Sequence, residues 1–285
     1  TMASALEKGL ITPTTVFNVP GQIDIGDATI HDAWAHGPQN MTATGILGKS
    51  SNVGTLMIAQ QVGPDAFMTM ARKLGQGVKT GIQLPAETSG RLPAQSTWSS
   101  STFGNLPIGQ GVSESLLQLA GMYQAIANNG VRITPTLIAS TTVDGVTTPT
   151  PMGAQTVTMS PATSKTLIQM LHGPIQGGDS YHRGTAPQAA ITGYQVAGKT
   201  GTAQQVDEDT GEYSKTAITS TFAGFLPADN PKYVIAIMLD NPKGNSPAGT
   251  TSCAPLFHDI AAYAMRAADV PPSAGEAPIF DLYVD

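Results

Sequence analysis

The segment Gly198-Lys199-Thr200-Gly201-Thr202-Ala203 combines residue types that could bind an anionic ligand. The hydroxyls of Thr200 and Thr202 can bind a carboxylate, the Lys199 ammonium supplies positive potential, and Gly201 lets a ligand backbone approach closely. An apolar, strand-like run at residues 194–197 leads into the segment. A lone Lys-Thr-Gly usually lies at an ordinary strand end, so its chemistry depends on which other residues the fold brings to it.

A second polar cluster, Ser50-Ser51-Asn52, lies about 150 positions earlier. Hydroxyl and amide side chains in front of a helix commonly do no more than cap its first turn. In an acyl-transfer site they can do more, because the Ser50 hydroxyl can relay a proton between a nucleophile and a leaving amine. The Asn52 amide can bind a peptide carbonyl in such a site. Both interpretations stay open from these residues alone.

The elements around Ser50-Ser51-Asn52 follow from helical periodicity. Apolar residues recur at helical spacing from Val53 to Val62, and Pro64 opens a second helix that is expected to run through Leu74. The cluster therefore falls on a loop at a helix N-terminus. Residues 1–8 are rich in Ala and precede Gly9, a pattern typical of the back half of a helix.

Two more helices and a strand-rich segment are expected in the middle of the chain. Ser113 is predicted to cap a helix that ends at residues 128–130. Ser160-Pro161 is predicted to start a helix that ends near Leu171. Between them, residues 131–157 favour short strands and turns.

The C-terminal part is expected to form a sheet covered by a helix. Three strand candidates, residues 191–205, 217–225 and 233–239, are separated by turn-forming segments at 207–211 and 227–231, so an antiparallel meander is predicted. The last helix should pack on this sheet, after which residues 271–285 are expected to be a poorly ordered tail. Its packing stripe is predicted to contain Leu256, Phe257, Ile260, Ala261, Ala264 and Met265.

Composition narrows the class of protein. The 285 residues are 40% hydrophobic and 12% charged with a formal net charge of −6, which indicates a globular chain without a basic face for nucleic acid. Cys253 is the single cysteine and is expected to be a small buried group. The histidines show no metal-ligand spacing, so no metal is predicted. No apolar run approaches the roughly 18 residues of a spanning helix, so any membrane anchor is expected outside the chain.

The chain resembles class B penicillin-binding proteins, because six short strings occur in the order found in that family. The ending, with Asp240-Asn241-Pro242 followed by Ala254-Pro255-Leu256-Phe257, is most similar to the cell-division (septal) branch, and the sequence as a whole resembles actinobacterial members. The six strings are Ser50-Ser51-Asn52-Val53-Gly54, Thr80-Gly81-Ile82-Gln83-Leu84-Pro85-Ala86-Glu87, Gly90-Arg91-Leu92-Pro93, Ile108-Gly109-Gln110-Gly111, Ala127-Asn128-Asn129-Gly130 and Gly198-Lys199-Thr200-Gly201-Thr202-Ala203.

The resemblance implies an α/β fold of the penicillin-binding transpeptidase (β-lactamase-like) type, a central antiparallel sheet flanked by helices, present here as its C-terminal larger portion. Residues 1–270 would form the transpeptidase domain and 271–285 its tail. The first strands and the Ser-x-x-Lys motif with the nucleophilic serine would precede Thr1. An N-terminal segment outside this chain would anchor the protein at the extracytoplasmic face of the cell membrane.

The resemblance also implies an activity, that of a D,D-transpeptidase which cross-links peptidoglycan stem peptides during septal cell-wall synthesis and is inhibited by β-lactams. Lys199 and Ser50 would handle protons and electrostatics, and Asn52 would position the acyl chain. Thr200, Gly201 and Thr202 would form the carboxylate site, and the Thr202 N–H would be half of an oxyanion hole. The implied partners are the stem peptide, β-lactam antibiotics, the missing N-terminal part of the same protein and divisome membrane proteins, with no nucleic acid and no cofactor.

Two alternatives remain at this stage. A β-lactamase or a D,D-carboxypeptidase on the same scaffold would resolve the acyl-enzyme with water, although no convincing Glu-containing deacylation loop is visible and a structural hydrogen bond is expected for Glu87. A non-catalytic penicillin-binding sensor domain is the alternative from outside the enzymes, since Ser-x-x-Lys does not occur in this chain.

Overall fold

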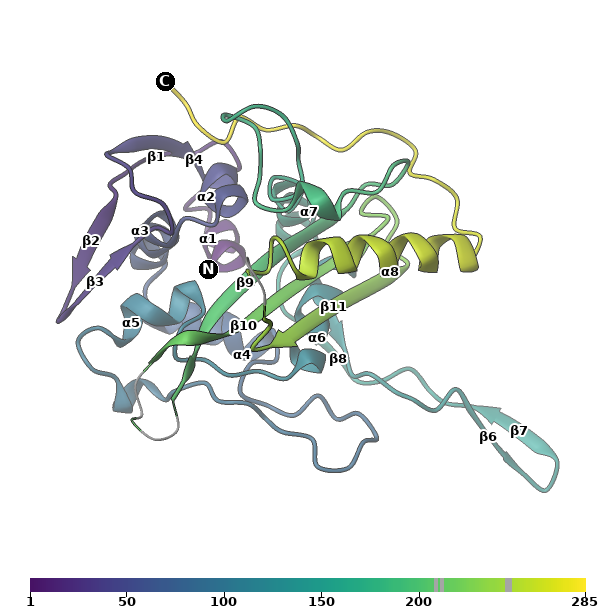
Figure 1. Cartoon of the computed structure of the whole chain (residues 1–285). Helices are drawn as coiled ribbons and strands as arrows, with labels where there is room; N and C mark the ends of the chain where they lie inside the picture. Colours follow the sequence, from purple (N-terminus) through teal and green to yellow (C-terminus); the bar gives the residue numbers. More distant parts are fainter. Residues whose placement is uncertain (208–209, 211–212, 244–247) are drawn as a thin grey trace.

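A three-stranded antiparallel sheet in the order β11, β10, β9 forms the centre of the molecule (Figure 1). The computed structural model describes residues 1–207, 210, 213–243 and 248–285. The strands are β9 Ala197–Val206, β10 Tyr213–Leu226 and β11 Tyr233–Asp240. The predicted meander is therefore confirmed, although part of the expected turn at 207–211 lies outside the described residues.

The first strand starts later than the sequence pattern indicated. Ile191 and Tyr194 form an isolated bridge around Gly193, which has a φ of 85°. A positive φ closes a turn there, so regular pairing begins only at Ala197, opposite Phe225.

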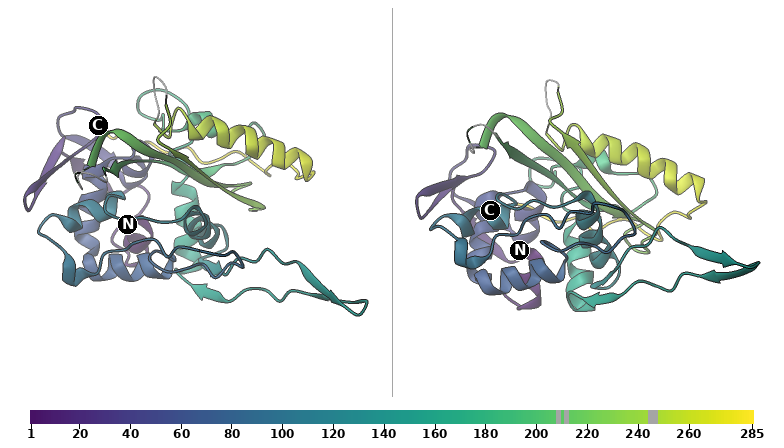
Figure 2. Two further views of the ribbon diagram at one scale, coloured as in Figure 1. Left: turned by 60° about the horizontal axis from the view of Figure 1, so that its bottom comes forward. Right: turned by 90° about the horizontal axis from the view of Figure 1, so that it is seen from below.

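Helices cover both faces of the sheet. Helix α8, Cys253–Ala267, packs on one face, and α6, Leu116–Ala127, on the other (Figure 2). Phe222 of β10 and Phe257 of α8 have ring centroids 4.5 Å apart, and both are fully buried. The prediction that α8 packs on the sheet is confirmed.

The predicted packing stripe of α8 is shifted. Leu256 and Ile260 are 38% and 42% exposed, whereas Cys253 and Ala254 are fully buried together with Phe257, Ala261 and Met265. The predicted stripe is too wide on one side, because it includes large apolar residues that face solvent. The small residues are the ones that fit closest to the sheet. The expectation for Cys253 as a small buried group is confirmed.

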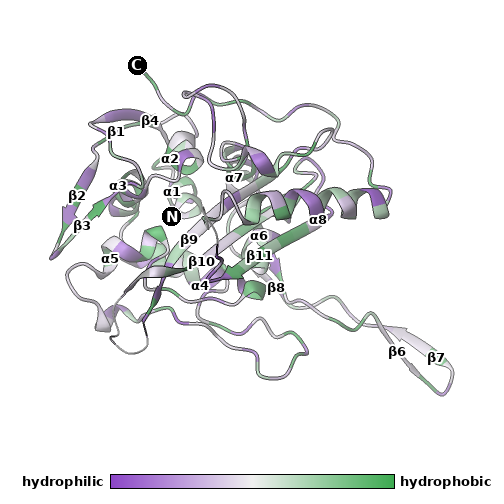
Figure 3. Cartoon of the chain, in the orientation of Figure 1, coloured by the Kyte–Doolittle hydropathy of each residue, from purple (hydrophilic) through white to green (hydrophobic). Residues whose placement is uncertain are grey.

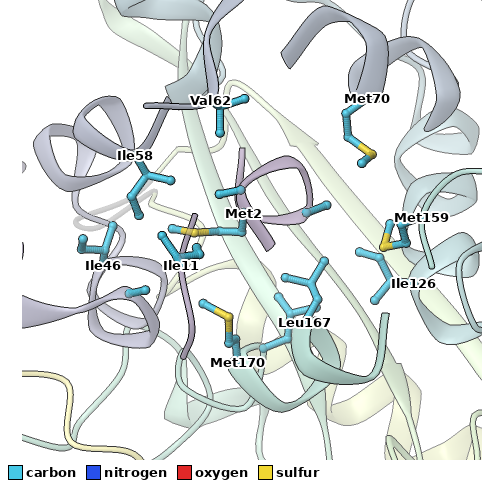
Figure 4. Packing of buried hydrophobic residues seen from close by; sticks show 14 of the residues in the cluster. Met2, Ile11, Ile46, Ile58, Val62, Met70, Ile126, Met159, Leu167 and Met170 are labelled. Carbon is cyan, nitrogen blue, oxygen red and sulfur yellow. The ribbon is translucent and has the colours of Figure 1, made fainter. Parts of the chain in front are cut away.

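The remaining helices form a second layer beneath the sheet, and their apolar side chains make one core (Figure 4). Most were predicted within one or two residues of their ends, but α2 and α5 were not predicted. Their bounds are α1 Met2–Glu7, α2 Ala43–Lys49, α3 Asn52–Val62, α4 Pro64–Lys73, α5 Thr102–Asn105 and α7 Pro161–Met170, with short 3-10 turns at Gln95–Thr97, Leu106–Ile108 and Pro187–Ala189.

Short strand pairs surround these layers. The β6–β7 hairpin projects away from the body (Figure 1). The pairs are β1 Val16–Val19 with β4 Gln39–Thr42, β2 Gln22–Ile25 with β3 Ala28–His31, β5 Val131–Ile133 with β8 Gln155–Val157, and β6 Ser140–Val143 with β7 Val146–Pro149.

Ser115, not Ser113, caps α6. Its side chain accepts a hydrogen bond from the Gln118 N–H, and the Gln118 side chain accepts one from the Ser115 N–H, which together form a capping box. The backbone of Ser113 is instead paired with Arg91. The Ser-x-x-Gln spacing that marks this box was present in the sequence.

The C-terminal tail packs against the rest of the domain, contrary to the expectation of poor order. Leu282 is fully buried, its N–H donates to the Tyr181 carbonyl, and its carbonyl accepts from the Thr42 N–H. Tyr283 forms a bridge with Met41 of β4. The tail has no helix or continuous strand, so its order depends on these long-range contacts.

Replacing Leu282 by Ala should lower the free energy of unfolding by about 2–5 kcal/mol, because it empties a fully buried site beside Gly48. Urea or thermal unfolding measures the effect. Ile279→Ala is the matched control in the same tail, because Ile279 is 75% exposed and its loss should stay within about 0.5 kcal/mol. Equal effects of the two substitutions would contradict a packed tail.

Candidate active site

Strand β9 lies at the edge of the sheet, and no strand among the described residues pairs with its outer edge along the Lys-Thr-Gly segment. The Gly198 N–H donates to the carbonyl of Leu171, which is outside the sheet, at 3.2 Å. In an antiparallel strand, alternate residues direct their N–H groups to the same edge. The N–H groups of Thr200 and Thr202 therefore point away from β10. Figure 3 shows β9 paler than the apolar strand β11, as expected for a strand of Gly and Thr.

Lys199 and Ser50 meet across 149 positions of sequence. The Lys199 ammonium donates to the Ser50 hydroxyl oxygen at 2.8 Å, to the Thr200 carbonyl at 2.8 Å and to the Thr200 hydroxyl at 3.3 Å. Among the described residues, no carboxylate forms an ion pair with Lys199. Burial lowers the pKa of Lys199 to about 8, because the charged form loses hydration without gaining an anionic partner.

The Ser50 side chain is directed by an unusual backbone conformation. Ser50 ends α2 with φ 59° and ψ 43°, a left-handed geometry that is uncommon for residues other than glycine. Ser51 follows as the N-cap of α3, and its hydroxyl accepts from the Gly54 N–H at 2.9 Å. The predicted loop at a helix N-terminus is thus a single tight junction between two helices.

The structure places Asn52 differently from the other candidates. Its side-chain amide nitrogen donates to the carbonyl of His31 at 3.1 Å, at the end of β3. Asn52 is thus held beside Ser50 by its neighbour β3, and no direct hydrogen bond joins it to Lys199 in the structure.

Thr202 and Gly201 lie further along β9. The Thr202 hydroxyl accepts from the Gly249 N–H at 3.2 Å and keeps its own proton for another acceptor. A Cβ at Gly201 would collide with the Thr221 hydroxyl on β10, so a larger residue would require the Thr221 side chain to move. The Thr200 hydroxyl lies 3.4 Å from that of Thr185.

A groove of about 880 Å³ runs along β9. Residues 199–204 form one wall, and residues 105, 106 and 108–114 with Arg91 form the other. Arg91 and Ser113 are joined by two backbone hydrogen bonds of 2.7 and 3.0 Å, which tie the opposite wall together. These wall residues were not predicted as site residues. The sequence did contain a signal for these wall residues, because Gly90-Arg91 and Gly109-Gln110-Gly111 belong to the six strings on which the family resemblance is based.

The groove wall is close to the first helix. The Thr1 hydroxyl donates to the Pro107 carbonyl at 3.3 Å, and the neighbours of Pro107 line the groove. Glu114 also lines the groove, and burial raises the pKa of its carboxyl group. Helix α1 therefore starts beside the groove wall.

The described residues contain no cluster of three or more His, Cys, Asp or Glu side chains that could hold a metal ion. No helix formed by these residues has the length and hydropathy needed to span a bilayer.

Comparison with known proteins connects this geometry to a family. A profile of the penicillin binding protein transpeptidase domain matches residues 1–262. Penicillin-binding protein PbpB of Mycobacterium tuberculosis is 50% identical over 279 residues, which is 97% of this chain and 41% of PbpB. Peptidoglycan D,D-transpeptidase FtsI of Escherichia coli is 30% identical over 272 residues, 95% of this chain and 43% of FtsI. The chain thus spans less than half the length of these two relatives.

A solved structure gives the same result for the fold. Penicillin binding protein 3 of M. tuberculosis in complex with ampicillin has a TM-score of 0.95 and 49% sequence identity, over 100% of this chain and 64% of that one. The predicted fold class is confirmed by this match and by the sheet and helices described above. Because the profile covers residues 1–262 and the fold agrees throughout, the chain belongs to the penicillin-binding protein transpeptidase family, as its class B resemblance predicted.

Proposed function

We propose that the protein containing this chain is a D,D-transpeptidase that cross-links peptidoglycan stem peptides during septal cell-wall synthesis and is acylated by β-lactams. The observation that carries the proposal is the 2.8 Å hydrogen bond from Lys199, a residue that lines the groove, to Ser50, which is not among the lining residues. The names of FtsI, a peptidoglycan D,D-transpeptidase, and of PBP3, complexed with ampicillin, support it.

The reaction would run through an acyl-enzyme. A serine on the part of the protein that precedes Thr1 attacks the penultimate D-Ala carbonyl of a stem peptide, and the terminal D-Ala leaves as its amine takes up a proton. The amine of a neighbouring stem then attacks the ester, and the serine regains its proton. If α1 extends backwards by about six residues, the helix becomes about 9 Å longer. The serine would then lie about that far from Thr1, beside the groove.

The residues of this chain would hold and polarise the peptide. Ser50 and Lys199 pass the proton to the leaving amine, and the Lys199 charge attracts the terminal carboxylate that Thr200 and Thr202 bind. The Thr202 N–H, at the open edge of β9, polarises the carbonyl together with the N–H of the serine. One such donor contributes about 2.7–4 kcal/mol of transition-state stabilisation.

The hydrolytic alternative gains no support from Glu87. Glu87 accepts hydrogen bonds from the Thr80 N–H at 2.7 Å and from the Gly81 N–H at 3.1 Å. These bonds fasten its own loop, as expected, and favour a structural role over that of a general base in β-lactamase or D,D-carboxypeptidase chemistry.

The cellular setting is part of the same proposal. The domain would lie at the extracytoplasmic face of the cell membrane, held by an anchor N-terminal to Thr1, and would work with membrane proteins of the divisome. The identity to mycobacterial PbpB, 50%, against 30% to FtsI of E. coli, supports the actinobacterial assignment.

Incubation of the full-length protein with a fluorescent penicillin should label it in a one-to-one ratio, and mass spectrometry should map the adduct to a serine before Thr1. Such a serine is required because the attack needs an oxygen next to Lys199 and Ser50. An adduct on a residue of this chain would contradict the assigned nucleophile. A protein that is not labelled at all would contradict the proposed function.

The acylation rate should fall as the pH rises through about 8, because Lys199 then loses the charge that donates to Ser50 and attracts the carboxylate. Stopped-flow acylation between pH 6 and 10 measures this. In Lys199→Arg the guanidinium stays charged, so the alkaline limb should move to higher pH even though the absolute rate is lower. An unchanged limb would assign the titration to another group.

Thr202→Ala should reduce acylation by carboxylate-bearing substrates about 10- to 150-fold, because it removes a hydrogen bond to a charged group worth roughly 1.5–3 kcal/mol but keeps the backbone N–H. A substrate without that carboxylate serves as the control and should lose much less. Thr202→Ser keeps the hydroxyl and should retain most of the activity. Equal losses on both substrates would remove the carboxylate role from Thr202.

A further inference from the structure

A buried carboxylate lies directly behind the Ser50-Ser51-Asn52 junction. The side chain of Asp32 is 0% exposed, and its two oxygens accept three hydrogen bonds. One oxygen accepts from the Ser51 hydroxyl at 2.8 Å and from His36 Nε2 at 3.0 Å, and the other accepts from the Val53 N–H at 3.0 Å. A buried charge is stable only when it is paired and hydrogen-bonded, and Asp32 meets both conditions.

Asp32 and its neighbour hold the start of α3 from outside the helix. The first N–H groups of a helix have no partner within it, and Asp32 satisfies that of Val53 while Ser51 satisfies that of Gly54. The carbonyl of His31 accepts from the Asn52 side chain. Two consecutive residues at the end of β3 thus fix three consecutive residues at the junction.

His36 completes this arrangement from the other side. Its Nδ1 lies 2.7 Å from the Gly37 carbonyl and its Nε2 lies 3.0 Å from Asp32, so both ring nitrogens face acceptors. The ring is therefore held between two acceptor oxygens, one from Asp32 and one from the backbone. The ring is 3% exposed and stacks on Trp34 at 5.1 Å. Neither partner can rotate without breaking a buried contact.

The left-handed conformation of Ser50 requires such support. It costs a residue other than glycine roughly 1–2 kcal/mol and persists only where the surroundings determine it. The Ser51 N–H donates to the Ile46 carbonyl at 3.0 Å while the Ser51 hydroxyl donates to Asp32, so the residue after Ser50 is held on two sides. The Ser50 hydroxyl is thereby directed at Lys199.

We propose that Asp32 and His36 are positioning residues for acyl transfer, which act by holding Ser51 and thus the Ser50 hydroxyl against Lys199. The inference rests on the proposed function. It assigns to the hydrogen-bonded pair of Asp32 and His36 an effect on the chemical step, in addition to its contribution to stability.

The test uses the full-length protein and separates penicillin binding from acylation by stopped-flow fluorescence. Asp32→Asn keeps the size of the side chain but replaces one acceptor oxygen with a donor, so the three donors cannot all be satisfied. Since a misplacement of about 1 Å can cost about 100-fold in rate, we expect the acylation rate constant to fall about 10- to 100-fold. The dissociation constant of the complex before acylation should change by less than about threefold.

A double-mutant cycle identifies the path. If Asp32 acts through Ser51, the loss in Asp32→Asn with Ser51→Ala should be much smaller than the product of the single losses. Ser51→Thr keeps the hydroxyl and should restore the rate lost in Ser51→Ala. If Asp32→Asn does not fold, this pair still tests the step on which the inference depends, because acylation of Ser51→Ala at the wild-type rate would overturn it.

The matched control for stability is Met265→Ala, which empties a fully buried site between α8 and the sheet. It should lower the unfolding temperature and leave the acylation rate constant unchanged. The inference would be overturned if the Asp32→Asn protein is acylated as fast as wild type, or if the rate losses in the double-mutant cycle are independent. Either result would leave the proposed function standing. Wild-type protein that is not acylated would instead refute the proposed function.

Discussion

The unpaired edge of β9 is the constraint on which the rest of the structure depends. Unpaired N–H and C=O groups at a sheet edge attract other strands and are usually covered. Here the edge is closed at one end by Leu171, which accepts from Gly198, and lies open beside the groove along Thr200 and Thr202. Packing of α8 and α6 on the two faces keeps the sheet rigid, so the open edge has a fixed direction.

Two buried charged groups near this edge, Asp32 and Lys199, differ in the partners that the protein gives them. Asp32 accepts hydrogen bonds from Ser51 and Val53 and lies against the His36 ring, so its carboxylate oxygens are occupied within the protein. Lys199 has hydroxyl and carbonyl partners but no carboxylate among the described residues, and burial lowers its pKa. The partners of the structural carboxylate are therefore all internal, while the Lys199 ammonium stays available to an anionic ligand.

Local signals in the sequence predicted much of this arrangement. Pro64 and Ser160-Pro161 mark helix starts that the structure confirms, and the turn-forming segments predicted the antiparallel meander. The contact between Lys199 and Ser50 was expected from the resemblance, not from periodicity. The packed tail could not be predicted, because it depends on contacts between elements far apart in sequence. The same holds for the hydrogen bonds of Asp32 to Ser51 and Val53, which bury the Asp32–His36 pair. An aspartate and a histidine four positions apart carry no local signal for burial.

The packed tail also affects how the domain is made. Thr42 donates its hydroxyl proton to the Asp281 carbonyl, 239 positions later, and Leu282 fills the space beside Gly45 and Gly48 of α2. At a synthesis rate of about 5–20 residues per second, α2 waits tens of seconds for this partner. During that interval the helix that leads into Ser50 lacks one side of its core. The domain therefore cannot complete its folding while its C-terminal segment is still inside the ribosome.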